Sequence, residues 1–239
     1  IRGKGTNNVL QINQARLITS LKMTKGNKEN LENDDYVSVV NLIGNSYIKA
    51  IDIDINGVNI PALSNNHYNY KSYIETILSY GNDACKSQLI SGGYYNDSAG
   101  LFDEMRDPVV GNEAAAAGDD AKRNDGFNRR MELFRNSAIV QFVSTIHSDF
   151  LHTTKCLLPD TDMKIRLHRE NDQFLILTRQ IQKNFKIEIV DIKMELHWIT
   201  INNNISNYYQ NKLNNISTSA EYEFNKSEIS IHSIGNGLY

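Results

Sequence analysis

The sequence contains little cysteine and no long apolar run, and both scarcities exclude classes of protein. Cys85 and Cys156 are the only cysteines among 239 residues. Two thiols cannot build the disulfide framework of a small secreted domain, so we expect both to be reduced. No stretch approaches the length of about 18 apolar residues that a bilayer-spanning helix needs. The sequence therefore predicts a globular chain without a membrane span.

A large excess of charge of one sign is also lacking. Lys and Arg number 25 and Asp and Glu number 28, which gives a formal net charge of −3. This balance provides no general attraction to nucleic acid or to an anionic membrane. The most basic patch, formed by Lys122, Arg123, Arg129 and Arg130, lies among aspartates of residues 119–125. We therefore expect a solvated loop there and no specific nucleic-acid binding.

Several motifs of common enzymes are missing. The chain contains no GxxxxGK[ST] or GxGxxG loop for phosphates, no GxSxG nucleophile turn and no CxxC pair. We therefore predict that the protein is not an enzyme, with no catalytic residues and no cofactor.

The sequence is dominated by segments in which apolar and polar residues alternate, and this pattern predicts an all-β protein. Apolar and polar residues alternate along residues 15–23, which puts the apolar side chains on one face of a strand. The longest β pattern runs from Lys186 to Ile201. Its apolar face changes side near Val190, which predicts a β-bulge or a strand that crosses between sheets. Further strands are predicted at residues 138–146, 163–167, 174–177 and 222–231, and helices at residues 36–48, 83–90 and 206–213. Many short strands with turns between them favour an antiparallel sandwich.

The stretch from Ile51 to Gly81 has the clearest periodicities. Isoleucines and aspartates alternate from Ile51 to Ile55, and Asn56-Gly57 follows, which predicts a hairpin with a tight type I′ turn. Asp52 and Asp54 are expected on its solvated face. Apolar side chains then recur at helical spacing, and Gly81 is predicted to be a left-handed helix cap. The helical stripe consists of Tyr70, Tyr73, Ile74, Ile77 and Leu78. At this spacing it is more often core than a platform for a ligand.

Residues 103–130 combine glycines, a run of four alanines and mixed charges, which predicts a long surface loop.

The best candidate for a metal site is His147-x-Asp149-x-x-His152. Imidazole and carboxylate suit zinc or iron, and His147 and Asp149 would share one face of a strand. The competing interpretation is a polar strand end, and it is favoured because short His/Asp patterns occur by chance. A metal-dependent jelly-roll enzyme nevertheless stays open as an alternative function.

Four N-x-[ST] sequons begin at Asn96, Asn204, Asn215 and Asn225. In a secreted protein they could carry glycans, so a carbohydrate-binding β-sandwich is a second alternative. Chance is the preferred explanation in a chain this rich in asparagine.

An ordered series of segments resembles the double jelly-roll major capsid (hexon) proteins of Polinton/Maverick elements and adintoviruses, including transposon-derived copies in animal genomes. The series covers roughly residues 36–235. It begins with the hairpin and continues with the helix, a second short helix, an aromatic turn, an Arg-containing segment at residues 128–130 and the strand after Leu157-Leu158-Pro159. The matching residues of the helices and the turn are Tyr68, Tyr70, Tyr73, Ile74, Glu75, Thr76, Leu78, Tyr80, Gly81, Lys86, Ser87, Leu89, Tyr95, Asp97, Ala99 and Gly100.

The resemblance implies a structural protein of a virion capsid, assembled inside the host cell, in the nucleus or the cytoplasm. Such subunits form homotrimeric capsomers that tile an icosahedral shell and meet other capsid proteins such as a penton. Residues 1–225 are expected to be the first jelly-roll domain, with short helices inserted in its connections. Residues 226–239 are expected to be a linker or the start of a second jelly roll. The chain is then a fragment or a degenerate genomic copy, and it is expected to begin inside a longer protein.

The resemblance also changes the expected role of the helix that ends near Gly81. The helix becomes an insertion between jelly-roll strands that closes one end of the sandwich, with its tyrosines packed inward. Substituting Ile74 and Ile77 by Asp should then unfold the domain. The candidates for structural or assembly contacts are Tyr70, Tyr73, Ile74, Ile77, Tyr80 and Gly81, together with the loop at residues 103–130.

Overall fold

The computed structural model describes residues 1–60, 66–105, 124–180, 182–215 and 219–232. Antiparallel strands dominate it, which confirms the predicted all-β, sandwich-like fold with short helices in the connections. The strands are β1 (Asn8–Lys25), β2 (Val37–Val39), β3 (Ile48–Ile55), β4 (Val58–Asn59), β5 (Ile139–Thr145), β6 (Met163–Arg169), β7 (Ile176–Thr178) and β8 (Phe185–Thr200). The helices are α1 (Ile43–Ser46), α2 (Tyr68–Ser79), α3 (Asn82–Cys85), α4 (Asp125–Leu133), α5 (Asp172–Leu175) and α6 (Asn203–Leu213), with 3-10 turns η2 (Gln88–Gly92), η3 (Arg135–Ser137) and η4 (Asp149–His152).

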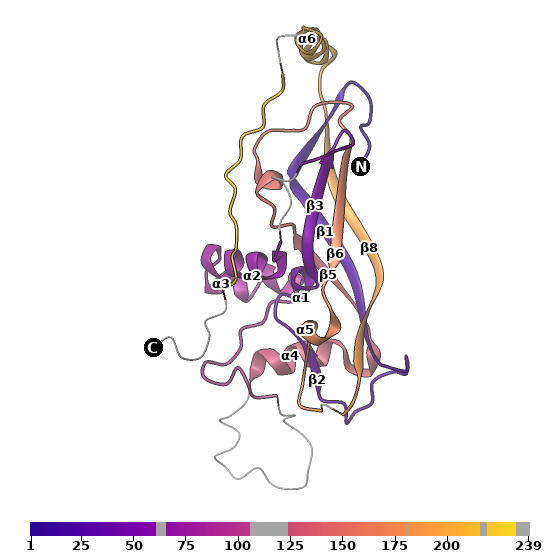
Figure 1. The fold of residues 1–239 in the computed structure, drawn as a ribbon, viewed down its shortest axis with the longest axis vertical. Helices are drawn as coiled ribbons and strands as arrows, with labels where there is room; N and C mark the ends of the chain where they lie inside the picture. Colours follow the sequence, from indigo (N-terminus) through magenta and orange to yellow (C-terminus); the bar gives the residue numbers. More distant parts are fainter. Residues whose placement is uncertain (61–65, 106–123, 181, 216–218, 233–239) are drawn as a thin grey trace.

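The described strands form two three-stranded sheets and one pair. One sheet has the order β5-β1-β8, the other β4-β3-β6, and β2 pairs with β7. Figure 1 shows the long strands running along the long axis of the molecule, with α2 and α3 on one side and α6 at one end. α4 lies toward the other end, so the helices lie on one side and toward the two ends of the strands rather than alternate with them.

The long strand β1 confirms the predicted alternation and supplies much of the core. Leu17, Leu21 and Met23 are fully buried and belong to one cluster with Ile51 and Ile53 of β3. This burial of apolar surface on both sheets is the main stabilising contribution to a sandwich.

The predicted irregularity in β8 lies at Val190. Ser20 pairs with Asp191 and Leu21 pairs with Ile189, so Val190 is an extra residue between the two pairs. A β-bulge of this kind moves the following side chains to the other face, which is why the apolar pattern changes side there.

The predicted hairpin is also present. Asn56 and Gly57 have φ angles of 50° and 77°, the positive values that a type I′ turn requires. Ile55 and Val58 pair across the turn. The aspartates of β3 were expected on a solvated face, and that expectation is wrong for Asp54. Its carboxylate accepts from both terminal nitrogens of Arg166 at 2.7 and 2.8 Å, and the residue is buried.

Three sequence-based assignments of secondary structure are wrong. Residues 36–48 form β2 and the four-residue α1 instead of one helix, because Val37 and Val39 pair with β7. The predicted strand at residues 174–177 begins as the end of α5, whose start is capped by the Asn171 side chain. Residues 222–231 are extended but pair with no described strand.

The predicted loop at residues 103–130 ends earlier than expected. Residues 106–123 lie outside the described part of the chain, but α4 begins at Asp125, where Asn124 caps the N–H groups of Gly126 and Phe127. Arg130 is not part of a solvated patch. It is buried, donates from Nε to the Val39 carbonyl at 2.9 Å and pairs with Asp97 at 2.8 Å.

Candidate functional site

Helix α2 lies on one side of the sandwich, next to α1 and β3 (Figure 1). It begins after His67, whose backbone is left-handed with φ of 56°. The residues that face the body of the protein are mostly polar. The buried ones are Tyr68, Asn69, Lys71, Ser72 and Thr76.

The apolar face of α2 points away from the body, so the prediction of an inward-packed stripe is wrong. Leu78 is 80% exposed and Ile77 is 47% exposed. Tyr73 is intermediate and lies against Tyr94, with ring centroids 6.3 Å apart. We call the exposed residues the α2 stripe, which consists of Tyr70, Ile74, Ile77, Leu78 and Tyr80.

Ion pairs explain why the polar face is the buried one. The Lys71 ammonium lies 2.6 Å from Asp149 Oδ1 and 3.4 Å from Glu75 Oε1, and the Lys71 side chain is 4% exposed. Glu75 in turn lies 2.9 Å from His147 Nδ1. Because a buried charge is costly without a partner, these contacts fix which side of α2 faces the body.

Tyr68 adds a neutral anchor at the start of α2. Its hydroxyl donates to Asn45 Oδ1 at 3.2 Å and accepts from the His147 N–H at 3.0 Å. Complete burial raises the pKa of Tyr68 well above its ordinary value, so the hydroxyl keeps its proton and can donate. The Asn69 amide donates to Glu170 Oε2 at 3.2 Å, which ties the same turn to the end of β6.

Both carboxylates under α2 are held in their charged forms. Burial opposes ionisation of Glu75, but the hydrogen bond with His147 and the charge of Lys71 outweigh burial and lower the pKa. Burial opposes ionisation of Asp149 as well, but hydrogen bonds from Lys71 and the Ser227 N–H lower its pKa. The buried face of α2 is therefore attached by charge-assisted contacts.

A cavity of about 480 Å³ opens between α2 and η4. Glu75, Tyr80, His147 and His152 line it, and the two imidazole centroids are 6.2 Å apart. Burial and the neighbouring His147 lower the pKa of His152 below its ordinary value, which favours the neutral ring.

The predicted metal triad does not converge on one point. His147 follows the end of β5 and contacts Glu75, whereas Asp149 begins η4 and contacts Lys71 and Ser227. Among the described residues, a group of three ligand atoms within 4.8 Å of one another occurs at Glu32, Asp34 and Asp35 and not at these three.

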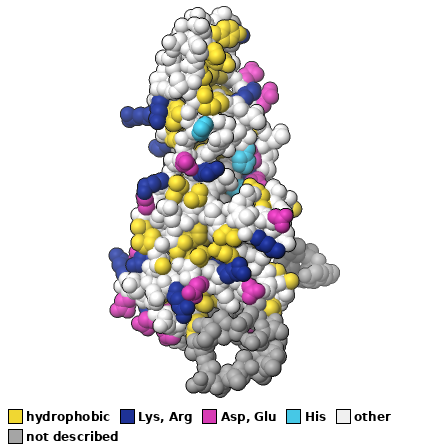
Figure 2. Space-filling view, turned by 180° about the vertical axis from the view of Figure 1, so that it is seen from behind, with side chains coloured by type: hydrophobic (Ala, Val, Ile, Leu, Met, Phe, Trp, Pro, Cys, Tyr) yellow, Lys and Arg dark blue, Asp and Glu magenta, His cyan; other side chains and the backbone are white. Residues whose placement is uncertain are grey.

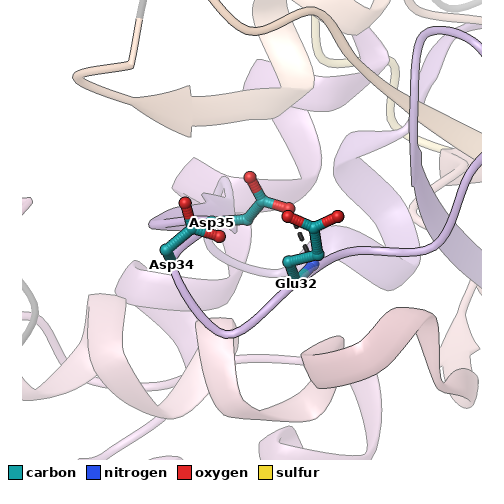
Figure 3. Close-up of side chains that lie close together, drawn as sticks. All are labelled: Glu32, Asp34 and Asp35. Atoms are coloured by element: carbon teal, nitrogen blue, oxygen red, sulfur yellow. Dashed lines mark hydrogen bonds between the residues drawn. The ribbon is translucent and has the colours of Figure 1, made fainter.

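Figure 3 shows that acidic group, which comes from the loop between β1 and β2. Two ammonium groups pair with it, with Lys25 at 2.9 Å from Glu32 and Lys183 at 2.7 Å from Asp35. Burial opposes ionisation of Asp35, but the Glu32 N–H and Lys183 outweigh burial and lower its pKa. These contacts account for the cluster as a set of ion pairs, and we assign no metal to it.

The end of α2 also differs from expectation. Tyr80 ends the helix in an extended conformation, and Gly81 has a φ of −81° and starts α3. A left-handed cap is therefore absent at Gly81. That role belongs to Gly93 at the end of η2, where φ is 80°.

Two contacts of the site had little signal in the sequence. Tyr70 packs edge-on against Phe174, with ring centroids 5.6 Å apart, and so widens the apolar surface beyond α2. Tyr94 packs against Tyr73, and burial, together with the neighbouring Tyr73, raises the pKa of Tyr94 to about 12. The spacing of Lys71 and Glu75 is that of an i, i+4 ion pair on a helix. Nothing in the sequence shows that Lys71 is buried.

Comparison with known proteins adds one relative. The chain is 24% identical over 169 residues to "Uncharacterized protein F54H12.2" of Caenorhabditis elegans. The similar region covers 70% of this chain and 35% of that protein, so the chain spans about a third of its relative's length. No family model and no solved structure matches the chain.

No helix in the described part of the chain has both the length and the apolar character needed to cross a bilayer.

Proposed function

We propose that the chain is a structural subunit of a viral capsid, a jelly-roll protein of the hexon type that forms trimeric capsomers. The observation that carries this proposal is the outward orientation of the α2 stripe. Five large apolar or aromatic residues, each at least 36% exposed, lie on or directly after one helix. A contiguous exposed apolar surface of this kind marks an interaction site more often than a free surface.

The attachment of α2 suits a contact surface that must keep its shape. Tyr68, Lys71 and Glu75 fix the helix to the body through Asn45 of α1, Asp149 of η4 and His147, which lies between β5 and η4. A helix that cannot rotate presents its side chains in one arrangement, which lowers the entropic cost of association. The proposed occupant of the surface is another copy of the chain or a second capsid protein such as a penton.

Charge on the surface is consistent with partners that are proteins. On the face seen in Figure 2, Lys and Arg side chains lie among Asp and Glu side chains without a broad patch of one sign. Specific nucleic-acid binding needs a concentrated basic surface. Together with the formal net charge of −3, this mixed surface favours a protein over a nucleic acid as the partner.

The alternative of a metal-dependent enzyme has less support. His147 and Asp149 are engaged with different partners, Glu75 and Lys71. Among the described residues, the one group of three close ligand atoms is the ion-paired acidic loop of Glu32, Asp34 and Asp35. The carbohydrate-binding alternative stays a prediction.

The test is the size and shape of the assembled protein. The chain is purified, and a second version is extended by the sequence that follows it in the gene, because the relative is longer. Light scattering and negative-stain electron microscopy are expected to show trimers, and pseudo-hexagonal particles or shells with the extended version. Monomers of both versions at every concentration up to the solubility limit would contradict the proposal.

A further inference from the structure

Residues 219–232 form an extended segment that we call the strap. The strap follows α6 and runs down the side of the molecule toward α2 and α3, where it is the yellow trace in Figure 1. It joins none of the three described sheets, so no ladder of backbone hydrogen bonds holds it. The side chains of the strap must therefore provide the attachment.

Two aromatic side chains of the strap pack on one residue of the body. Tyr222 and Phe224 both pack edge to face against Phe150, with their ring centroids 6.1 and 5.8 Å from that of Phe150. Phe150 is buried, whereas the residues on either side of Phe224 are exposed. The alternation of inward and outward side chains is that of an extended peptide on a surface.

Polar contacts fix the register of the strap. The Asp149 carboxylate accepts from the Ser227 N–H at 2.7 Å and from the Ser227 hydroxyl at 3.0 Å. The Leu158 N–H donates to the Tyr222 hydroxyl at 3.1 Å, and Lys155 donates to the Glu221 carbonyl at 3.0 Å. The body residues that make these contacts form the strap seat, which consists of Asp149, Phe150, Lys155, Cys156 and Leu158.

The strap seat has the features of a peptide-binding site. It offers an aromatic anchor, a carboxylate that holds a backbone N–H and a second backbone contact, all from one short stretch of chain. Aromatic anchors in pockets with a few fixed polar groups are what give specificity to the recognition of extended peptides.

We propose that the strap seat binds this peptide sequence in trans, so that the strap of one copy occupies the seat of a second copy. The contacts are identical whether the strap comes from the same chain or from a neighbour, so the two arrangements differ only in the effective concentration of the strap. This inference rests on the proposed function to bring the copies together, because neighbours in a shell are held at high local concentration.

The experiment uses the full chain and a fluorescent peptide of residues 219–232. In one variant the chain's own strap is released by Tyr222→Ala, Phe224→Ala and Ser227→Ala, which leaves the seat unchanged. We expect saturable one-to-one binding of the peptide to this variant, about tenfold tighter than to the unaltered chain, whose own strap competes. Should the triple variant not fold, the single variant Phe224→Ala replaces it.

Two matched controls address the seat. A peptide with Phe224→Ala should bind at least several-fold more weakly, and Asp149→Asn in the released variant should weaken binding of the original peptide. For exchange between chains, the released variant is mixed with an Asp149→Asn chain that keeps its strap. Native mass spectrometry should then detect mixed dimers that neither protein forms alone.

Absence of saturable binding, equal binding of the two peptides, or absence of mixed dimers would overturn the inference. The peptide measurement does not depend on shell assembly. A chain that binds the peptide but never forms trimers contradicts the proposed function alone, and a chain that forms trimers but binds no peptide contradicts this inference alone.

Discussion

The ammonium of Lys71 lies 2.6 Å from a carboxylate oxygen of Asp149, although the two residues are 78 positions apart in the chain. The Lys71 side chain is 4% exposed and that of Asp149 is 15% exposed. The pair joins α2 to η4, and through Ser227 it also joins the strap. This ion pair therefore contacts both α2, which carries the proposed contact surface, and the strap, which we propose to exchange between copies.

Removing the charge of Lys71 should destabilise the protein. In Lys71→Met the Asp149 carboxylate keeps Ser227 but loses its counter-charge, which we expect to lower the free energy of unfolding by about 2–4 kcal/mol. Urea denaturation followed by circular dichroism measures the change. Lys86→Met is the control, because Lys86 is exposed, and it should change the free energy by less than about 0.5 kcal/mol. Equal stability of the two variants would mean that the buried pair is not formed.

Stability should also depend on pH through His152. The pKa of this imidazole is lowered in the folded protein from the ordinary value of 6.5, so the unfolded chain binds a proton more readily. The contribution of the neutral ring is therefore fully present above about pH 6.5 and is lost as the pH falls below that value toward the folded pKa. His152→Gln should flatten this part of a plot of unfolding free energy against pH.

The matched control is His232→Gln, which removes an exposed histidine and keeps His152. Its profile should keep the dependence on pH that His152→Gln loses. A His152→Gln profile that coincides with that of the unaltered protein would show that His152 is not desolvated.

Substitutions at two glycines test which of them is a left-handed helix cap: Gly93, as the structure shows, or Gly81, as the sequence predicts. At Gly93, with φ of 80°, a Cβ would lie 2.7 Å from Ile43 Cγ2, so Gly93→Ala should lower the free energy of unfolding by at least about 1–3 kcal/mol. At Gly81 an added Cβ meets nothing within 4 Å and φ is negative, so Gly81→Ala should be neutral or slightly stabilising. Thermal unfolding of the two variants measures the difference. Strong destabilisation by Gly81→Ala alone would restore the cap assigned from the sequence.

Local patterns explain which parts of the fold could be predicted. The faces of β1, the Asn56-Gly57 turn and the bulge at Val190 each follow from residues close together in sequence. The rule that the apolar face of a helix packs inward was the natural expectation for α2, and it failed. Lys71 and Glu75 find partners on a segment some 70 or more positions away, at Asp149 and His147, and no local pattern shows this.

The same reason accounts for the other errors. Residues 174–177 were assigned to a strand from their apolar run, but Asn171 caps a helical turn first. Residues 222–231 alternate as a strand does, yet their partners are the Phe150 ring and the Asp149 carboxylate instead of a neighbouring strand. In an extended segment, periodicity indicates which side chains face the body, but it does not indicate what the backbone pairs with.

The most direct test of the account is the double substitution Ile74→Asp with Ile77→Asp in α2. Both residues are exposed, at 41% and 47%, so the variant should fold with an unfolding temperature close to that of the unaltered protein. Light scattering should show that it no longer forms trimers. The control is Val58→Asp with Ile139→Asp, which adds the same charges at exposed positions away from α2 and should still assemble. An Ile74→Asp/Ile77→Asp protein that unfolds, or that assembles as well as the control, would contradict the assignment of the α2 stripe as the contact surface.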